Sequence, residues 1–174
     1  MQRYIAEFEK RWNGYVRKAC QSSRVDETYV KIHRRWVYLY RVVDRDGNSI
    51  DFRLSPKRDV AAAKALFRKA LKTQDRAQDS ITLDGYAASH GALRELPADS
   101  DAWQATKLRS SKYLNNRIER DHRGVKSRIA PMLSGKAFDR AAITIAGTEL
   151  LGRIRKGQFA LGQLRLQGQS APAI

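Results

Sequence analysis

The run at residues 36–43, W-V-Y-L-Y-R-V-V, constrains the fold more than any other part of the chain. Aromatic and β-branched residues at this density are typical of a buried β-strand. Residues 24–32 and 49–54 on either side also have strand-like composition, and the turn signal D-G-N at 46–48 precedes the second of them. The sequence therefore predicts three antiparallel strands that form a meander.

Helical and short strand patterns alternate after the meander. We expect strands at residues 81–84 and 102–108, and helices at residues 4–15, 60–72, 87–96, 113–129 and 137–156. Asp59 stands where it would cap the second helix, and Pro97 where it would end the third. These patterns predict an α/β fold with one mixed sheet and helices on both faces. The glycine- and glutamine-rich stretch from residue 157 is expected to fray.

The charge of the chain restricts the class of partner. The 174 residues include 34 Lys and Arg against 18 Asp and Glu, a formal net charge of +16 at pH 7. This excess favours a polyanion, with DNA or RNA first and an acidic membrane surface second. The sequence shows no apolar stretch of about 18 residues, so we expect no membrane-spanning segment. The single cysteine, Cys20, excludes a disulfide-built scaffold and fits a reducing cytoplasm.

Three acidic residues stand out by their positions: Asp26, Asp84 and Glu119. Asp26 lies inside an apolar strand pattern, where an unpaired charge is costly to bury. Asp84 ends the predicted fourth strand, and strand ends collect functional sites in α/β sheets. Glu119 lies at the edge of the apolar stripe of a predicted helix. Carboxylates that meet repel one another unless they share a cation, and such a group suits two divalent cations acting on a phosphodiester.

Each of the three carboxylates also has a simpler interpretation. Asp26 would be a solvent-facing residue of an edge strand, Asp84 a turn residue before Gly85, and Glu119 an exposed partner of Arg123. For the other residues of interest, we expect turn, surface or cap roles for Asp44, Asp46, Asp51 and Asp59, and sheet packing rather than base stacking for Trp36, Tyr38 and Tyr40.

Basic residues gather at two places. We expect DNA contacts from His122, Arg123 and Lys126 on the helix of Glu119, and from Lys31, Arg34 and Arg35 in the first hairpin. Lys126 stands seven residues, or about two helical turns, after Glu119, so both share one helix face. His122 and Arg123 could instead orient Glu119 or simply be solvated on the helix. The hairpin group could be a solvated turn, and the overall charge favours DNA contact there.

Several of these residues lie in sequence words that resemble one family. The words are V-D-E-T-Y-V-K at 25–31, W-V-Y-L-Y-R-V-V-D at 36–44, I-T-L-D at 81–84, K-Y-L-N-N-R-I-E-R-D-H-R-G-V-K at 112–126, T-I-A-G at 144–147 and I-R-K-G-Q at 154–158. Together they resemble the catalytic domain of a DDE transposase from a bacterial insertion sequence, in the insertion-sequence family numbered six. The family's D-D-34-E spacing is matched by the 34 residues between Asp84 and Glu119. The resemblance extends from the N-terminus to about residue 161.

The resemblance implies a ribonuclease-H-like fold, with a mixed five-stranded sheet of three antiparallel strands and then two parallel ones. It implies that Asp26, Asp84 and Glu119 form a catalytic triad that binds two divalent ions, Mg²⁺ or Mn²⁺. Lys126 corresponds to the basic residue that contacts transposon-end DNA. The implied reaction is DNA strand cleavage that frees a 3′-hydroxyl, followed by attack of that hydroxyl on target DNA. A homo-oligomer, dimeric or larger, and a cytoplasmic, nucleoid-associated location in a bacterium are implied as well.

The domain organisation departs from the family pattern. Family members carry a helix-turn-helix domain before the catalytic domain, whereas we expect residues 1–20 to be the remnant of a linker to such a module. Residues 21–161 are expected to form the catalytic domain, and residues 162–174 a flexible tail. Two alternatives stay open: a shortened, transposition-incompetent remnant that binds DNA non-specifically, and a stand-alone nuclease or ribonuclease-H-like enzyme.

Overall fold

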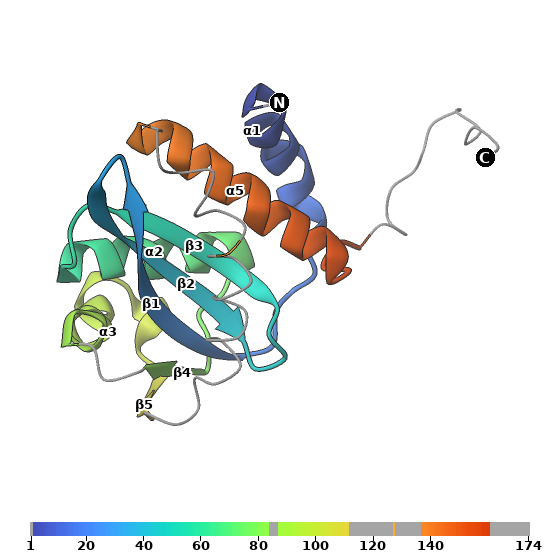
Figure 1. Cartoon of the computed structure of the whole chain (residues 1–174). Coiled ribbons are helices and arrows are strands. Elements are labelled where there is room, and N and C mark those ends of the chain that lie inside the picture. The colour runs from blue at the N-terminus through green and yellow to red at the C-terminus, as the bar shows by residue number, and fades with distance from the viewer. Residues whose placement is uncertain (1, 84–86, 112–126, 128–136, 161–174) are drawn as a thin grey trace.

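A single mixed sheet of five strands organises the protein, whose computed structural model describes residues 2–83, 87–111, 127 and 137–160 (Figure 1). The strands are β1 Ser22–Ile32, β2 Arg35–Asp44, β3 Ser49–Ser55, β4 Ser80–Leu83 and β5 Lys107–Ser110, in the spatial order β3-β2-β1-β4-β5. The first three pair antiparallel, β4 pairs parallel with β1, and β5 pairs parallel with β4. The predicted α/β fold class and the predicted meander are confirmed.

The meander forms because its strands alternate apolar residues toward two different layers. On β2, Tyr40 and Val42 face one core, while Val37 and Leu39 face the other. All four are nearly inaccessible to solvent. Burial on both faces explains why the central run is almost continuously apolar instead of alternating with polar residues.

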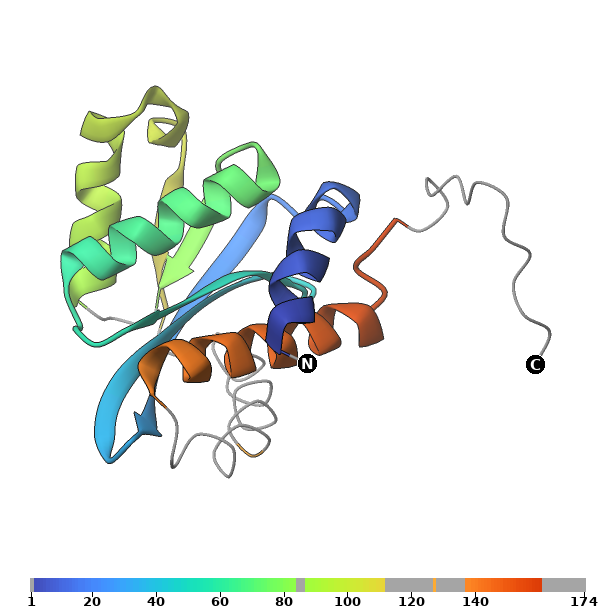
Figure 2. The ribbon, with the colours of Figure 1, turned by 90° about the horizontal axis from the view of Figure 1, so that it is seen from above.

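Helices cover both faces of the sheet (Figure 2). They are α1 Gln2–Trp12, α2 Val60–Gln74, α3 Ala87–Asp99 and α5 Phe138–Arg155. Helices α2 and α3 pack on one face, where Leu66, Phe67 and Leu96 enter the larger core. Helix α5 lies on the opposite face, where Ala141 and Ile145 meet β1 and β2, and α1 packs against α5. None of these four helices is long and apolar enough to span a lipid bilayer.

Two predicted element boundaries are wrong. Helix α3 continues through Pro97 to Asp99, because its buried Leu96 anchors the last turn and the Leu96 carbonyl accepts the Ser100 N–H at 3.1 Å. The strand predicted at 102–108 begins only at residue 107, and a 3-10 turn, Asp101–Trp103, precedes it. Trp103 lies in this turn and not in a strand, and it is buried because it packs edge-on against Phe67, at 6.0 Å between ring centres.

The expected fraying from residue 157 is also wrong for residues 157–160. Phe159 is buried, and it forms an antiparallel bridge with Val16. The side chain of Gln158 binds both backbone groups of Ser49, donating to its carbonyl at 3.0 Å and accepting its N–H at 3.2 Å. The chain after α5 therefore closes over the turn between β2 and β3. Residues 161–174 lie outside the described part of the chain.

The aspartates of the sequence analysis divide in two groups. Asp59 caps α2 by accepting the Ala62 N–H at 2.8 Å, and Asp44 holds the β2–β3 turn by accepting the Asp46 and Asn48 N–H groups, so both predictions are confirmed. Asp51 is not a surface residue. It is 3% exposed and ion-paired with Lys69 of α2 at 2.7 Å, because β3 carries it toward that helix.

Candidate active site

Asp26 lies in the middle of the sheet. Its strand β1 is flanked by β2 on one side and β4 on the other, and the residue is only 7% exposed. The interpretation of Asp26 as a solvent-facing residue of an edge strand is therefore wrong. One carboxylate oxygen, Oδ1, accepts the backbone N–H of Glu27 at 2.7 Å.

The register of β1 and β4 places the end of β4 beside Asp26. Leu83, the last residue of β4, is the parallel partner of Val25, which directly precedes Asp26. Leu83 also pairs with Ser110 at the end of β5. The carboxyl ends of both parallel strands therefore meet at the level of Asp26, the edge where α/β sheets collect their sites.

Five other predicted site residues lie outside the described residues: Asp84, Glu119, His122, Arg123 and Lys126. Among the residues that are described, no three His, Cys, Asp or Glu side chains lie close enough together to hold a metal ion. Asp26 is the one member of the predicted triad that lies among the described residues.

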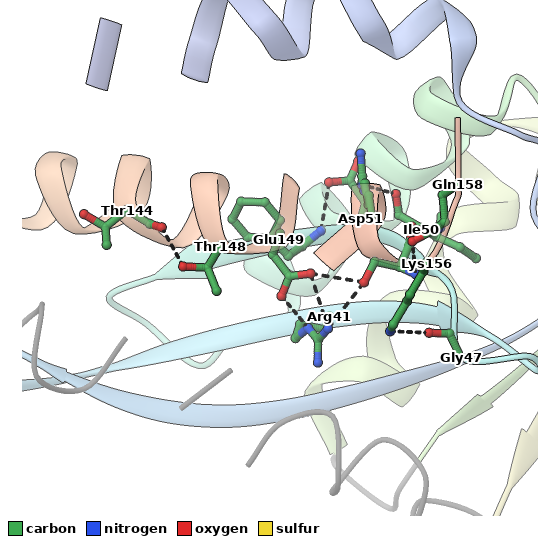
Figure 3. A network of polar contacts seen from close by, with 12 residues as sticks. Arg41, Gly47, Ile50, Asp51, Thr144, Thr148, Glu149, Lys156 and Gln158 are labelled. Atoms are coloured by element: carbon green, nitrogen blue, oxygen red, sulfur yellow. Dashed lines mark hydrogen bonds and ion pairs between the residues drawn. The ribbon is translucent and has the colours of Figure 1, made fainter. Parts of the chain in front are cut away.

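A buried ion pair lies on the same sheet face as Asp26 (Figure 3). Arg41 of β2 is the direct cross-strand partner of Asp26, so both side chains leave the same face of the sheet. Arg41 Nε lies 2.8 Å from Oε1 of Glu149 on α5, and both side chains are at most 4% exposed. Ser49 donates its hydroxyl to the other glutamate oxygen at 3.1 Å.

This pair was missed by the sequence analysis, although one signal was present. An arginine inside the strand run at 36–43 needs a buried counter-charge, by the same argument that singled out Asp26. The counter-charge, Glu149, is 108 residues away and belongs to a helix with no obvious polar stripe. The pair fixes α5 to the sheet next to the candidate site.

The end of α5 is tied to the β2–β3 turn by further polar contacts (Figure 3). Arg153 donates from Nη2 to the Ile50 carbonyl at 2.6 Å, and Lys156 donates from Nζ to the Gly47 carbonyl at 2.7 Å. Together with the Gln158 contacts to Ser49, these bonds fix the C-terminal end of α5 against β2 and β3.

Glu27 occupies the opposite sheet face and has a different environment. Its side chain is 2% exposed and pairs with Arg58. Burial raises the pKa of Glu27, and the neighbouring Arg58 guanidinium acts in the opposite direction. Burial also raises the pKa of the Tyr40 hydroxyl, and the carboxylate of Glu27 adds to that effect. The neighbours Asp26 and Glu27 thus lie on opposite faces of the sheet, and Glu27 faces the layer that contains α2.

The predicted basic hairpin lies at the far end of β1 and β2. A two-residue turn, His33 and Arg34, joins the strands, with φ angles of 46° and 64°. The side chains of Lys31, Arg34 and Arg35 are exposed. Trp36 does not pack in the sheet as predicted: it is 58% exposed and contacts Tyr29 edge-on, at 5.1 Å between ring centres. Tyr40 is fully buried, as predicted.

Solved structures share this fold. The HTLV-2 integrase catalytic core domain, solved in complex with magnesium, matches with a TM-score of 0.56 and 18% identity, over 75% of this chain and 83% of that one. A chain of the simian T-cell lymphotropic virus intasome, solved in complex with PP2A regulatory subunit B56 gamma, matches with a TM-score of 0.62 and 15% identity, over 92% of this chain and 60% of that one. The fold is that of a retroviral integrase catalytic core, the ribonuclease-H-like class predicted from the sequence.

The sequence comparisons narrow this class to a family. A family model described as the DDE domain matches residues 20–158. The transposase for the insertion sequence-like element IS431mec of Staphylococcus aureus (strain Mu50) is 35% identical over 133 residues, which are 74% of this chain and 56% of that transposase. The chain belongs to the DDE transposases of insertion-sequence family six, and it carries their catalytic domain. It spans about half the length of the curated relatives it matches.

Proposed function

We propose that this catalytic core cleaves DNA strands and joins the resulting 3′-hydroxyl to target DNA at a site formed by Asp26, Asp84 and Glu119. The observation that carries the proposal is the register of β1 and β4. It sets Leu83, which directly precedes Asp84 in the sequence, beside Val25, which directly precedes Asp26. Family membership and the 34-residue interval to Glu119 support the third member.

The chemistry of the donors fits divalent metal ions. Asp26 presents carboxylate oxygens, which are the hard ligands that Mg²⁺ and Mn²⁺ prefer. The Glu27 N–H donates to Asp26 Oδ1, and this hydrogen bond orients the carboxylate as an outer-shell contact orients a metal ligand. Asp26, Asp84 and Glu119 would hold two such ions, which supply an activated oxygen nucleophile and stabilise the leaving oxygen when they are bound.

The rest of the chain has supporting roles in this proposal. Arg41 and Glu149 keep the sheet and α5 in one fixed arrangement beside Asp26. His122, Arg123 and Lys126 would contact the phosphates of the transposon end, and Lys31, Arg34 and Arg35 would contact DNA farther from the reacting bond. The net charge of +16 favours binding along a polyanion. The chain would act as a homo-oligomer, dimeric or larger, on the DNA of the nucleoid in the bacterial cytoplasm.

Metal binding and strand cleavage test this proposal together. Isothermal calorimetry with Mg²⁺ and with Mn²⁺ is made on the wild-type chain, on Asp26→Asn and Asp84→Asn, and on the control Asp46→Asn, whose side chain is 65% exposed in a turn. Nicking of a DNA duplex that carries a family terminal repeat is measured in parallel. We expect Asp26→Asn and Asp84→Asn to lose metal binding and nicking while their circular dichroism is unchanged, and Asp46→Asn to retain both. Unaltered metal binding and nicking in Asp26→Asn would overturn the assignment.

A further inference from the structure

We propose that the end of the β1–β2 hairpin, on the sheet face that carries α2 and α3, is a stacking platform for unpaired bases of DNA. The aromatic–basic platform consists of Tyr29, Lys31, Trp36, Tyr38 and Arg58. This inference rests on the proposed function because it assumes a DNA substrate, and it adds a binding site that is separate from Asp26.

The ladder register places the platform residues on one face. Tyr29 is the cross-strand partner of Tyr38, and Lys31 is the partner of Trp36. Residues two apart on a strand share a face, so all four side chains project in one direction. Asp26 stands an odd number of positions from Tyr29 and therefore projects toward the other face. The platform can hold DNA without touching the candidate reaction site.

The two outermost aromatic rings are unusually accessible. Tyr29 is 57% exposed and Trp36 58% exposed, although both lie within regular strands. Their rings meet at an interplanar angle of 90°. Aromatic side chains at such exposure on a rigid hairpin leave ring faces on which a flat ligand can stack.

Cations accompany the rings. Lys31 Nζ lies 5.5 Å from the ring centre of Trp36, and the Arg58 guanidinium lies 6.0 Å from the ring centre of Tyr38. A base that stacks on Trp36 would displace Lys31 Nζ from its place over the ring, and the freed ammonium would pair with the phosphate of that nucleotide. Aromatic faces combined with adjacent Lys or Arg are the pattern of proteins that bind single-stranded nucleic acid.

The composition of the hairpin selects nucleic acid over a protein partner. Residues 29–36, Y-V-K-I-H-R-R-W, contain three permanent cations and one histidine, and they contain no acidic residue. A second copy of this chain, with its net charge of +16, would be repelled by such a surface. A phosphate backbone would be attracted to it, because it releases counterions when it binds.

The turn at the hairpin tip supports this assignment. His33 and Arg34 both adopt the left-handed conformation, and a two-residue turn of this kind is normally made by Asn-Gly. The chain thus keeps a cationic side chain at a position where glycine would be conformationally easier. Strain retained in this way is typical of functional segments.

Unpaired rather than duplex DNA is the ligand because stacking needs an open base face. In a duplex, the base faces are covered by neighbouring base pairs. Bases become available in single strands and at frayed or freshly cut ends, which are the states that strand cleavage and transfer produce. The platform would therefore hold unpaired bases on the sheet face opposite Asp26, away from the reacting bond.

Tryptophan fluorescence tests the platform directly, without metal ions. The chain has three tryptophans, of which Trp103 is 3% exposed and Trp12 is half-buried, so quenching by a single-stranded oligonucleotide would report mainly on Trp36. We expect quenching in the wild type and its loss in Trp36→Leu. We expect the single-strand affinity, measured by anisotropy of labelled DNA, to fall about tenfold in Trp36→Leu, and the affinity for a duplex of equal length to change much less.

Matched variants separate stacking from general surface effects. Tyr29→Phe keeps the ring and is expected to bind single strands as the wild type does, whereas Tyr29→Ser is expected to weaken that binding. Tyr4→Ser removes an exposed tyrosine of α1, 77% exposed, and is expected to change nothing. Because single-strand binding is measured without metal ions, a failure of the catalytic proposal in the nicking assay would leave the affinities of these variants unchanged.

Three outcomes would overturn the inference. One is a correctly folded Trp36→Leu variant that binds single strands as tightly as the wild type. Another is an equal loss of duplex and single-strand affinity, which would show that the hairpin acts only through its charge. The last is a change of sedimentation coefficient in Trp36→Leu without a change in DNA affinity, which would make the aromatic rings a contact between copies of the chain.

Discussion

Asp26 of β1 and Arg41 of β2 are direct partners in the antiparallel ladder, and the arginine is ion-paired with Glu149 of α5 on the same sheet face. The strand that carries Asp26 therefore pairs with β2, and β2 is joined to α5 by a buried ion pair between residues 108 positions apart. Such a pair contributes little net stability but enforces one arrangement, because an unpaired partner would be left in an apolar layer. We expect the ion pair to fix the position of α5 on the sheet face that carries Asp26.

Removal of one charge of this pair should be costly. In Glu149→Gln, Arg41 keeps its charge in the core without a carboxylate, so the free energy of unfolding is expected to fall by about 3 kcal/mol. Urea denaturation measures the change. The double variant Arg41→Met/Glu149→Leu removes both charges and is expected to recover most of the loss. If the double variant is less stable than Glu149→Gln, the buried pair is not the source of the effect.

The buried Glu27 predicts a specific pH dependence of stability. Burial raises its pKa above the ordinary value of 4.5, so the folded state favours the protonated form. The unfolded chain then releases the proton first, and the contribution of Glu27 to stability falls as the pH rises above 4.5. Glu27→Gln cannot ionise. Its unfolding free energy, relative to the wild type, is therefore expected to increase as the pH rises above 4.5.

Urea denaturation at several pH values measures this difference. Asp46→Asn serves as the control for the loss of one acidic side chain, because Asp46 is exposed in a turn. A difference between Glu27→Gln and the wild type that stays constant or shrinks with rising pH would contradict the assignment of a raised pKa.

The hairpin cations are expected to set the salt dependence of DNA binding. Each phosphate contact that is removed should reduce the slope of log K against log salt concentration by about one. We expect this for Arg34→Ala and Arg35→Ala, measured by anisotropy on duplex DNA over a range of salt concentrations. Lys72→Ala is the matched control, because Lys72 is exposed in the last turn of α2, close to the start of β1 and away from the hairpin tip. Equal slopes in all variants would exclude hairpin–phosphate contacts.

The turn itself offers a trade between stability and binding. His33→Asn/Arg34→Gly matches the residues that a turn with two positive φ angles prefers, so the free energy of unfolding is expected to rise by about 1 kcal/mol. The same variant loses a cation and should bind DNA more weakly at low salt. Thermal unfolding and DNA anisotropy on one preparation test both parts. A variant that gains no stability would show that the turn geometry is relaxed in the wild type.

The sequence predicted the candidate site only where local signals were sufficient. The spacing of Asp84 and Glu119 and the words around Asp26 pointed to the family, which the comparisons confirm, while the roles of these residues stay a prediction. The exposure of Trp36 was not predictable, because aromatic residues have the same strand preference in a covered and in an uncovered part of a hairpin. The burial of Asp51 likewise depends on Lys69, which reaches it from another element.

Strand and helix periodicity, caps and turns are indicated by residues that are neighbours in the sequence. The sequence by itself therefore determined the meander, the alternating second half and the fold class. These features are predicted from patterns of residues that are close in the sequence, although the strand pairs themselves join residues as distant as Ser22 and Ser80. The tertiary structure alone decided which charges are buried together and which aromatic rings stay outside. Arg41 and Glu149 meet across 108 residues, and only the packing of α5 on β2 could show that each charge has its partner.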